Sequence, residues 1–169
     1  MKKVQIIAFS ALFIALEVIL TRFLSIQTPI LRIGFTFLPV ALSAILLGPV
    51  ISGIIGVAAD ILGMLIFPSG VYFPGFTLSA FISGFIYGIF MYKKEASIIR
   101  TILAIITVII VVDIGLNSLW LSILMHKAFI GLLPLRIIKS LLMLPIQIIL
   151  IQFVWKGIRH FMPYSIRSN

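Results

Sequence analysis

The chain contains no cysteine and few charged residues. Charged residues make up 10% of the 169 positions, and only four of them are Asp or Glu. The missing cysteines exclude disulfides, thiolate chemistry and cysteine-based metal sites. The scarcity of charge accompanies 62% hydrophobic residues and a mean hydropathy of +1.31, which together exclude a soluble globular domain.

Motifs for nucleotide or metal chemistry are also missing. The sequence contains neither the phosphate-binding pattern G-x-x-x-x-G-K-[ST] nor the zinc pattern H-E-x-x-H. Its two histidines, His126 and His160, are predicted at opposite membrane faces, where they cannot share a metal. We therefore expect no enzyme activity, no metal and no cofactor. The net charge of +9 would suggest a nucleic-acid partner for a soluble protein, but here we interpret the cations against a bilayer and expect no nucleic acid.

Long uncharged runs, divided by glycine and proline, predict an all-α, polytopic membrane protein. A spanning helix needs about 20 mostly apolar residues. The second and third predicted helices are short and meet at Gly48-Pro49, so we expect them to be tilted, bent or incompletely spanning. The chain 1–169 is predicted to form a single integral membrane domain, with six helices near residues 4–24, 35–47, 50–66, 75–92, 98–125 and 132–158.

The basic residues predict that both termini lie in the cytoplasm, because cations that flank the spans are retained there. This orientation places eight cations inside: Lys2, Lys3, Lys93, Lys94, Arg100, Lys156, Arg159 and Arg167. It places five outside: Arg22, Arg32, Lys127, Arg136 and Lys139. Five is a large number for such short outer segments, and it calls for a further explanation.

The first predicted helix carries a stripe of small residues. Ala8, Ala11 and Ala15 recur at i, i+3 and i+7, and small side chains let another helix approach closely. Glu17 lies about 200° around the helix from Ala15, so it is predicted to face the bundle interior. Two interpretations of the stripe stay open: contact with a separate protein, or packing against helices of the same chain.

Two predicted outer loops contain proline, and the second is rich in aromatic residues. They cover residues 22–32 and 67–76. Aromatic residues at a membrane interface are usually anchors, which would explain Tyr72 or Phe76 alone. Four aromatic residues interleaved with glycine and proline favour instead a cover over a flat ligand.

The third outer region, 126–136, leads into the last predicted helix. Pro134 suits the first turn of that helix, which places Arg136 and Lys139 on one face near its N-terminus. Such a place attracts carboxylate or phosphate. Alternatively, both cations extend to anionic lipid headgroups. The depth of Lys139 favours a partner, either an anionic ligand or Glu17.

The fifth predicted helix presents one polar and aromatic face. Asp113, Asn117 and Trp120 follow at i, i+4 and i+7. Asn117 offers the donor and acceptor that recognise the edge of a heterocycle, and Trp120 offers a stacking surface. Alternatively, Asp113 and Asn117 tie neighbouring helices together. We expect Asp60 to be structural.

These residues identify a resemblance that covers essentially the whole chain. The chain resembles the substrate-binding S components of energy-coupling factor (ECF) vitamin transporters, and is most like the folate-specific ones. The family's contact motif, two alanines four apart, is matched by ALFIA at 11–15. The other segments that carry the resemblance are RIGFTFLP (32–39), LGP (47–49) with AD (59–60), FPSGVYFPGFTLSA (67–80), LNSLWL (116–121) and LLPLRIIK (132–139).

The resemblance implies a six-helix subunit that captures folate or a related pterin from outside and releases it inside. Release would follow reorientation with a membrane coupling subunit, bound through Ala11 and Ala15, and two cytoplasmic ATPases. Asn117 would lie at the edge of the pterin. Four aromatic residues would enclose its rings: Phe67, Tyr72, Phe73 and Trp120. Three cations would hold the glutamate carboxylates: Arg32, Arg136 and Lys139.

Two alternatives to folate stay open. S components for riboflavin, hydroxymethylpyrimidine, thiamine and pantothenate share the scaffold. A small membrane enzyme or channel that uses Glu17, Asp60 and Asp113 is the alternative from another class, although no catalytic pairing and no continuous polar stripe support it.

Overall fold

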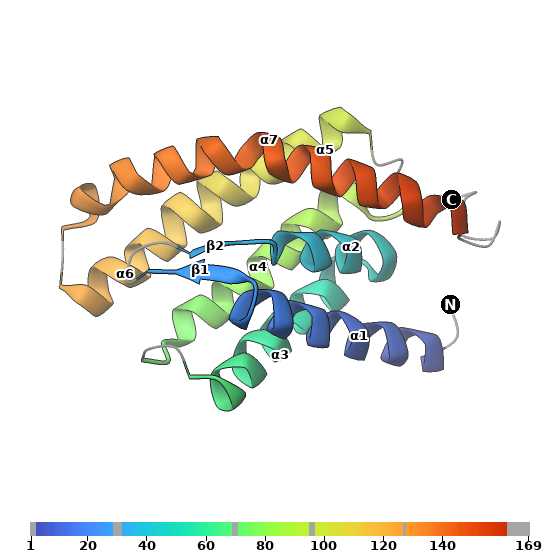
Figure 1. Ribbon diagram of the computed structural model, residues 1–169, viewed down its shortest axis with the longest axis horizontal. Helices are drawn as coiled ribbons and strands as arrows, with labels where there is room; N and C mark the ends of the chain where they lie inside the picture. Colours follow the sequence, from blue (N-terminus) through green and yellow to red (C-terminus); the bar gives the residue numbers. More distant parts are fainter. Residues whose placement is uncertain (1–2, 29–31, 69–70, 95–96, 127, 162–169) are drawn as a thin grey trace.

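The protein is a bundle of apolar helices with one small hairpin (Figure 1). The structure is a computed structural model and describes residues 3–28, 32–68, 71–94, 97–126 and 128–161. The strands are β1 (Ser25–Gln27) and β2 (Arg32–Gly34). The helices are α1 (Lys3–Arg22), α2 (Phe37–Leu47), α3 (Pro49–Ile66), α4 (Pro74–Met91), α5 (Ile98–Val108), the π-helix η1 (Ile109–Leu116), α6 (Asn117–Met125) and α7 (Phe129–Phe161).

The six predicted helices are confirmed, because α5, η1 and α6 follow one another without a break and form one span over residues 98–125. Among the described residues, five helices are long and apolar enough to cross a membrane, and α2 is shorter. The third helix, predicted at 50–66, is α3, and its 18 residues make it long enough to cross a membrane. The start of α1 and the end of α7 lie at the same end of the bundle (Figure 1).

The junction between α2 and α3 follows from its two residues. Gly48 has a positive φ of 92° and its N–H donates to the carbonyl of Ala44 at 3.1 Å, which ends α2. Pro49 occupies the first turn of α3, where a missing N–H costs nothing. The turn predicted at Gly48-Pro49 is therefore confirmed.

Glycines bring α3 and α4 into close contact. A side chain added at Gly56 would lie 2.9 Å from the carbonyl oxygen of Ala80, and one at Gly88 would lie 2.3 Å from Cα of Pro49. Small residues permit this approach, and packing is the main force between helices in lipid. The close contact sets which residues of α3 and α4 face the same space.

A β-hairpin begins within the loop predicted between residues 22 and 32 and extends past its end to Gly34. β1 and β2 are antiparallel, with Ile26 opposite Ile33. Gly34 faces Ser25, and a Cβ on Gly34 would lie 2.6 Å from the Cβ of Ser25. The hairpin extends away from the end of the bundle at which α1 begins (Figure 1).

The last helix begins earlier than predicted. α7 starts at Phe129, so Pro134 lies in the second turn and not in the first. The expectation that Arg136 and Lys139 lie beside the helix N-terminus is therefore wrong, because Arg136 is two turns from it. Their positive potential comes from their own charges.

The half of the bundle that contains the start of α1 and the end of α7 is packed with apolar side chains. Its core is built from side chains of α2, α4, α5 and α7, such as Ala44, Tyr87, Ile105 and Ile151, each at most 2% exposed. The other half of the bundle contains the polar residues described next.

Candidate binding cavity

A cavity of about 550 Å³ opens within the bundle. Its volume lies in the usual range of small-molecule pockets, about 300–1,000 Å³. Three of the four acidic residues of the chain contribute to its wall, together with three cations. These six charged residues are Glu17, Arg22, Asp60, Asp113, Arg136 and Lys139.

The first charged group joins α1, α3 and α4. Arg22 packs over Gly63 of α3 and interacts electrostatically with Asp60. Asp60 Oδ2 accepts a hydrogen bond from Thr77 Oγ1 at 2.7 Å, and Thr77 Oγ1 is 3.0 Å from the hydroxyl of Tyr72. Asp60, which we expected to be structural, both orders this chain of hydrogen bonds and lines the cavity.

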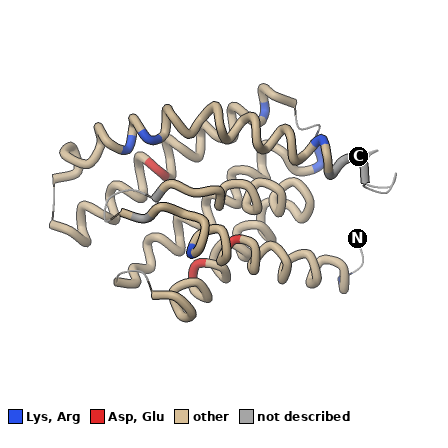
Figure 2. The backbone as a smooth tube through the Cα atoms, in the orientation of Figure 1, with Lys and Arg blue, Asp and Glu red and all other residues tan. Residues whose placement is uncertain are grey.

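The second charged group joins η1 and α7. Arg136 Nη1 donates to the backbone carbonyl of Asp113 at 2.6 Å, and Lys139 Nζ lies 4.0 Å from Asp113 Oδ2. The structure therefore pairs Lys139 with Asp113 and not with Glu17. Figure 2 shows acidic positions beside basic ones at two places within the bundle. In this second group two cations face one carboxylate, which leaves a positive excess.

Asn117 and Trp120, predicted on one face, divide between two environments. Asn117 lines the cavity and its Nδ2 donates to Asp113 Oδ1 at 3.5 Å. Trp120 is not among the described residues that line the cavity. Its Nε1 donates to Ser79 Oγ at 3.1 Å and its ring lies 5.7 Å from that of Phe73, centroid to centroid. Trp120 thus supports Phe73 from behind.

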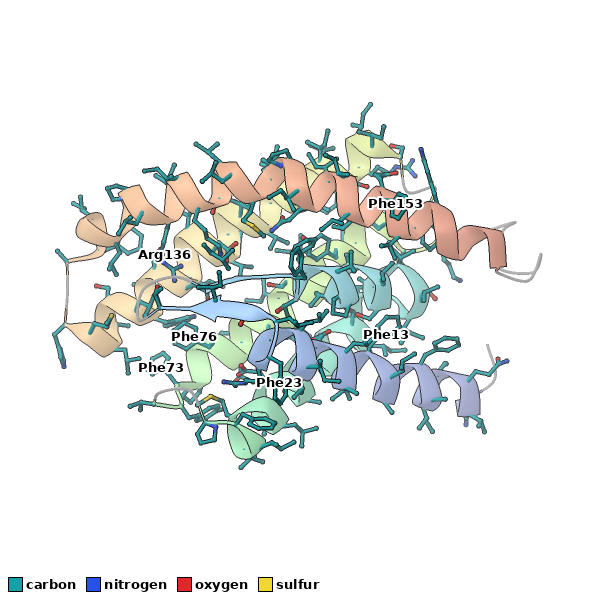
Figure 3. The ribbon with its side chains drawn as sticks, viewed as in Figure 1. Phe13, Phe23, Phe73, Phe76, Arg136 and Phe153 are labelled. Atoms are coloured by element: carbon teal, nitrogen blue, oxygen red, sulfur yellow. The ribbon has the colours of Figure 1, made fainter. Side chains whose placement is uncertain are left out.

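The aromatic residues predicted to cover the ligand also lie in two different places. Tyr72, Phe73 and Phe76 line the cavity, whereas Phe67 does not. The ring of Phe67 meets that of Phe23 edge-on at 4.8 Å. Figure 3 shows Phe73 and Phe76 together at the start of α4, with Phe23 at the end of α1. The backbone of Arg32 pairs with Gln27 in the hairpin, but the Arg32 side chain lies outside the described residues.

Glu17 is buried as predicted. It is 3% exposed, lines the cavity, and its Oε1 has no hydrogen-bond partner among the described residues. Sequence reasoning did not include Glu17, Arg22 or Asp60 among the binding residues. The signal that could have found them is their position as charges within apolar helices, where ionisable residues usually face a functional interior.

The alanine stripe on α1 faces outward. Ala8, Ala11 and Ala15 are all exposed in this chain. The interpretation that they pack against helices of the same chain is therefore wrong. The described residues contain no group of three or more His, Cys, Asp or Glu that could hold a metal ion.

Comparison with protein families gives a match over residues 1–156, to the family described as "ECF-type riboflavin transporter, S component". The Folate transporter FolT of Clostridium novyi (strain NT) is 50% identical over 156 residues, which cover 92% of this chain and 91% of that protein. The Folate transporter FolT of Leuconostoc mesenteroides is 36% identical over 144 residues, 82% of this chain and 77% of that protein.

A solved structure has the same fold. It is described as "Crystal structure of FolT bound with folic acid" and aligns with a TM-score of 0.84 at 41% sequence identity. The alignment covers 88% of this chain and 90% of the other.

Proposed function

The chain belongs to the S components of ECF-type transporters, multi-pass membrane proteins, and on that premise we propose that it is the subunit that captures folate outside the cell. The observation that carries the proposal is a cavity lined by aromatic residues and by a group in which two cations, Arg136 and Lys139, face the single carboxylate of Asp113. A flat heterocycle joined to a carboxylate-bearing tail fits both. Riboflavin, after which the matching family is described, carries no carboxylate for these cations.

In this proposal, different residues of the cavity bind the different parts of folate. Phe73 and Tyr72 stack on the pterin, with Trp120 holding Phe73 in place and Asn117 at the ring edge. Arg136 and Lys139 bind the glutamate carboxylates through charge-assisted hydrogen bonds. Phe67 and Arg32 complete the outer end of the site in this proposal.

Transport requires partners that supply energy. The chain has no nucleotide-binding motif, so hydrolysis of ATP belongs to two cytoplasmic ATPase subunits, and this subunit is not an enzyme. The exposed face with Ala11 and Ala15 contacts the coupling subunit in the membrane, and the remaining apolar surface contacts lipid. Both termini lie in the cytoplasm, and the single domain reorients as a body to release folate inside.

A competition experiment tests the substrate. The purified chain in detergent is loaded with labelled folate and challenged with folate, riboflavin, thiamine, hydroxymethylpyrimidine and pantothenate. We expect displacement by folate at concentrations far below those of the other four. Displacement by riboflavin at an equal or lower concentration than folate would show that folate is not the preferred substrate.

A further inference from the structure

Glu17 is a buried acidic side chain of the cavity whose Oε1 has no hydrogen-bond partner within the part of the chain that the structure describes. It projects from α1, is 3% exposed, and its Oε1 is inaccessible to water and without a hydrogen bond among the described residues. The three cations of the cavity interact with acids other than Glu17: Arg22 with Asp60, and both Arg136 and Lys139 with Asp113. The described residues therefore place no counter-ion on Glu17.

An unpartnered buried carboxylate is costly. Removing an ionised carboxylate from water costs several kcal/mol or more unless hydrogen bonds or an opposite charge compensate. A ligand that brings N–H donors into the cavity supplies that compensation. Glu17 lines the cavity, so a ligand bound there lies beside this side chain.

A second buried acceptor of the cavity, Asn117 Oδ1, also lacks a hydrogen-bond donor among the described residues. Asn117 donates a hydrogen bond from Nδ2 to Asp113 Oδ1. The other polar atom of the same amide, the acceptor Oδ1, takes no part in that bond. Asn117 Oδ1 is buried and has no hydrogen-bond partner among the described residues. Two unused acceptors in one cavity indicate a ligand whose ring edge is rich in donors.

We infer that Glu17 selects a 2-amino-4-oxo-pteridine ring by accepting hydrogen bonds from its 2-amino group and the neighbouring ring N3–H. This inference rests on the proposed function, because folate carries that ring. Two adjacent donors match the two oxygens of a carboxylate, and such charge-assisted pairs are roughly twice as strong as neutral ones. Glu17 also repels carboxylates, so it directs the heterocycle to α1 and the glutamate tail to Arg136 and Lys139 on α7.

The ligand half of the test uses the unaltered protein. Pterin and lumazine compete with labelled folate; lumazine has an oxo group where pterin has the 2-amino group. The 2-oxo group of lumazine cannot donate a hydrogen bond, so it would face the Glu17 carboxylate as one acceptor against another. We therefore expect lumazine to compete at least tenfold less well than pterin. Equal competition by the two rings would overturn the role of Glu17, and this result does not depend on any variant folding.

The protein half uses Glu17→Gln, which replaces one acceptor with a donor. We expect folate binding to weaken roughly 10- to 100-fold and the preference for pterin over lumazine to disappear. Competition by p-aminobenzoylglutamate, which lacks the pteridine, is expected to stay unchanged. Lys94→Gln, a charge neutralisation at an exposed position whose Nζ donates to the Ile89 carbonyl, is the control and should bind folate as the unaltered protein does.

The outcomes separate the two proposals. Saturable folate binding that is the same in the unaltered protein and in Glu17→Gln overturns the inference and leaves the proposed function standing. Absence of saturable folate binding by the unaltered protein overturns both.

Discussion

Asp113 sets the electrostatics of the cavity at the scale of single residues. Its carboxylate faces Lys139 and Asn117, while its carbonyl accepts a hydrogen bond from Arg136. One carboxylate cannot neutralise two cations, so the wall attracts a further anion at low cost. The same arrangement fixes Arg136, a residue that is 9% exposed, and leaves Lys139 as the more adjustable of the two cations.

Lys139→Gln is expected to weaken folate binding about tenfold, because it removes one charge-assisted hydrogen bond to a glutamate carboxylate. Binding of pterin, which carries no carboxylate, should stay within about twofold of that of the unaltered protein. Competition against labelled folate measures both. Equal losses for folate and pterin would contradict a role specific to the carboxylates.

At the scale of elements, the glycines of α3 and α4 decide which side chains share the cavity. Because these glycines bring α3 and α4 into contact, Thr77 of α4 can hydrogen bond to Asp60 of α3. Sequence spacing along one helix does not reveal such a register between two helices. This is why the apolar runs predicted the spans, while the role of Asp60 in the cavity was missed.

The π-helix explains a second difference from the predicted site. The i, i+4, i+7 face assumed 3.6 residues per turn, but residues 109–116 form the wider i→i+5 turns of a π-helix. The change in register leaves Asp113 and Asn117 in the cavity and turns Trp120 toward Ser79 of α4. The sequence did not predict the short hairpin, because strands of three residues are too short to show an alternating pattern.

Gly88→Ala is expected to lower the melting temperature in detergent. The added methyl would lie 2.3 Å from Cα of Pro49, and relieving that overlap moves backbone at a cost of about 1–3 kcal/mol. Gly131→Ala is the matched control, because nothing lies within 4 Å of its added methyl and alanine favours a helix. An equal or higher melting temperature for Gly88→Ala would contradict close α3–α4 packing.

At the scale of the whole molecule, the proposed function places ligand binding and assembly on different surfaces. The cavity is lined by residues from the second half of α1 and from the first half and middle of α7, and it reaches the hydrophobic core at Val40 and Tyr87. The alanine stripe on α1 faces outward, opposite Glu17. A substitution in the alanine stripe should therefore affect assembly without affecting ligand binding.

Ala11→Trp tests this separation. We expect it to abolish co-purification with the coupling subunit, because a bulky ring prevents close helix approach, and to leave folate binding unchanged. Ile149→Trp adds the same ring to an exposed position of α7 and should assemble normally. Normal assembly of Ala11→Trp would place the contact elsewhere.

Equilibrium dialysis of the purified chain against radiolabelled folate, without nucleotide and without any partner subunit, tests the claim that this chain alone binds folate. We predict saturable retention of one folate per chain, since the cavity is formed by this chain alone. Retention that does not saturate, or that appears only when the coupling subunit and ATPases are added, would contradict the claim.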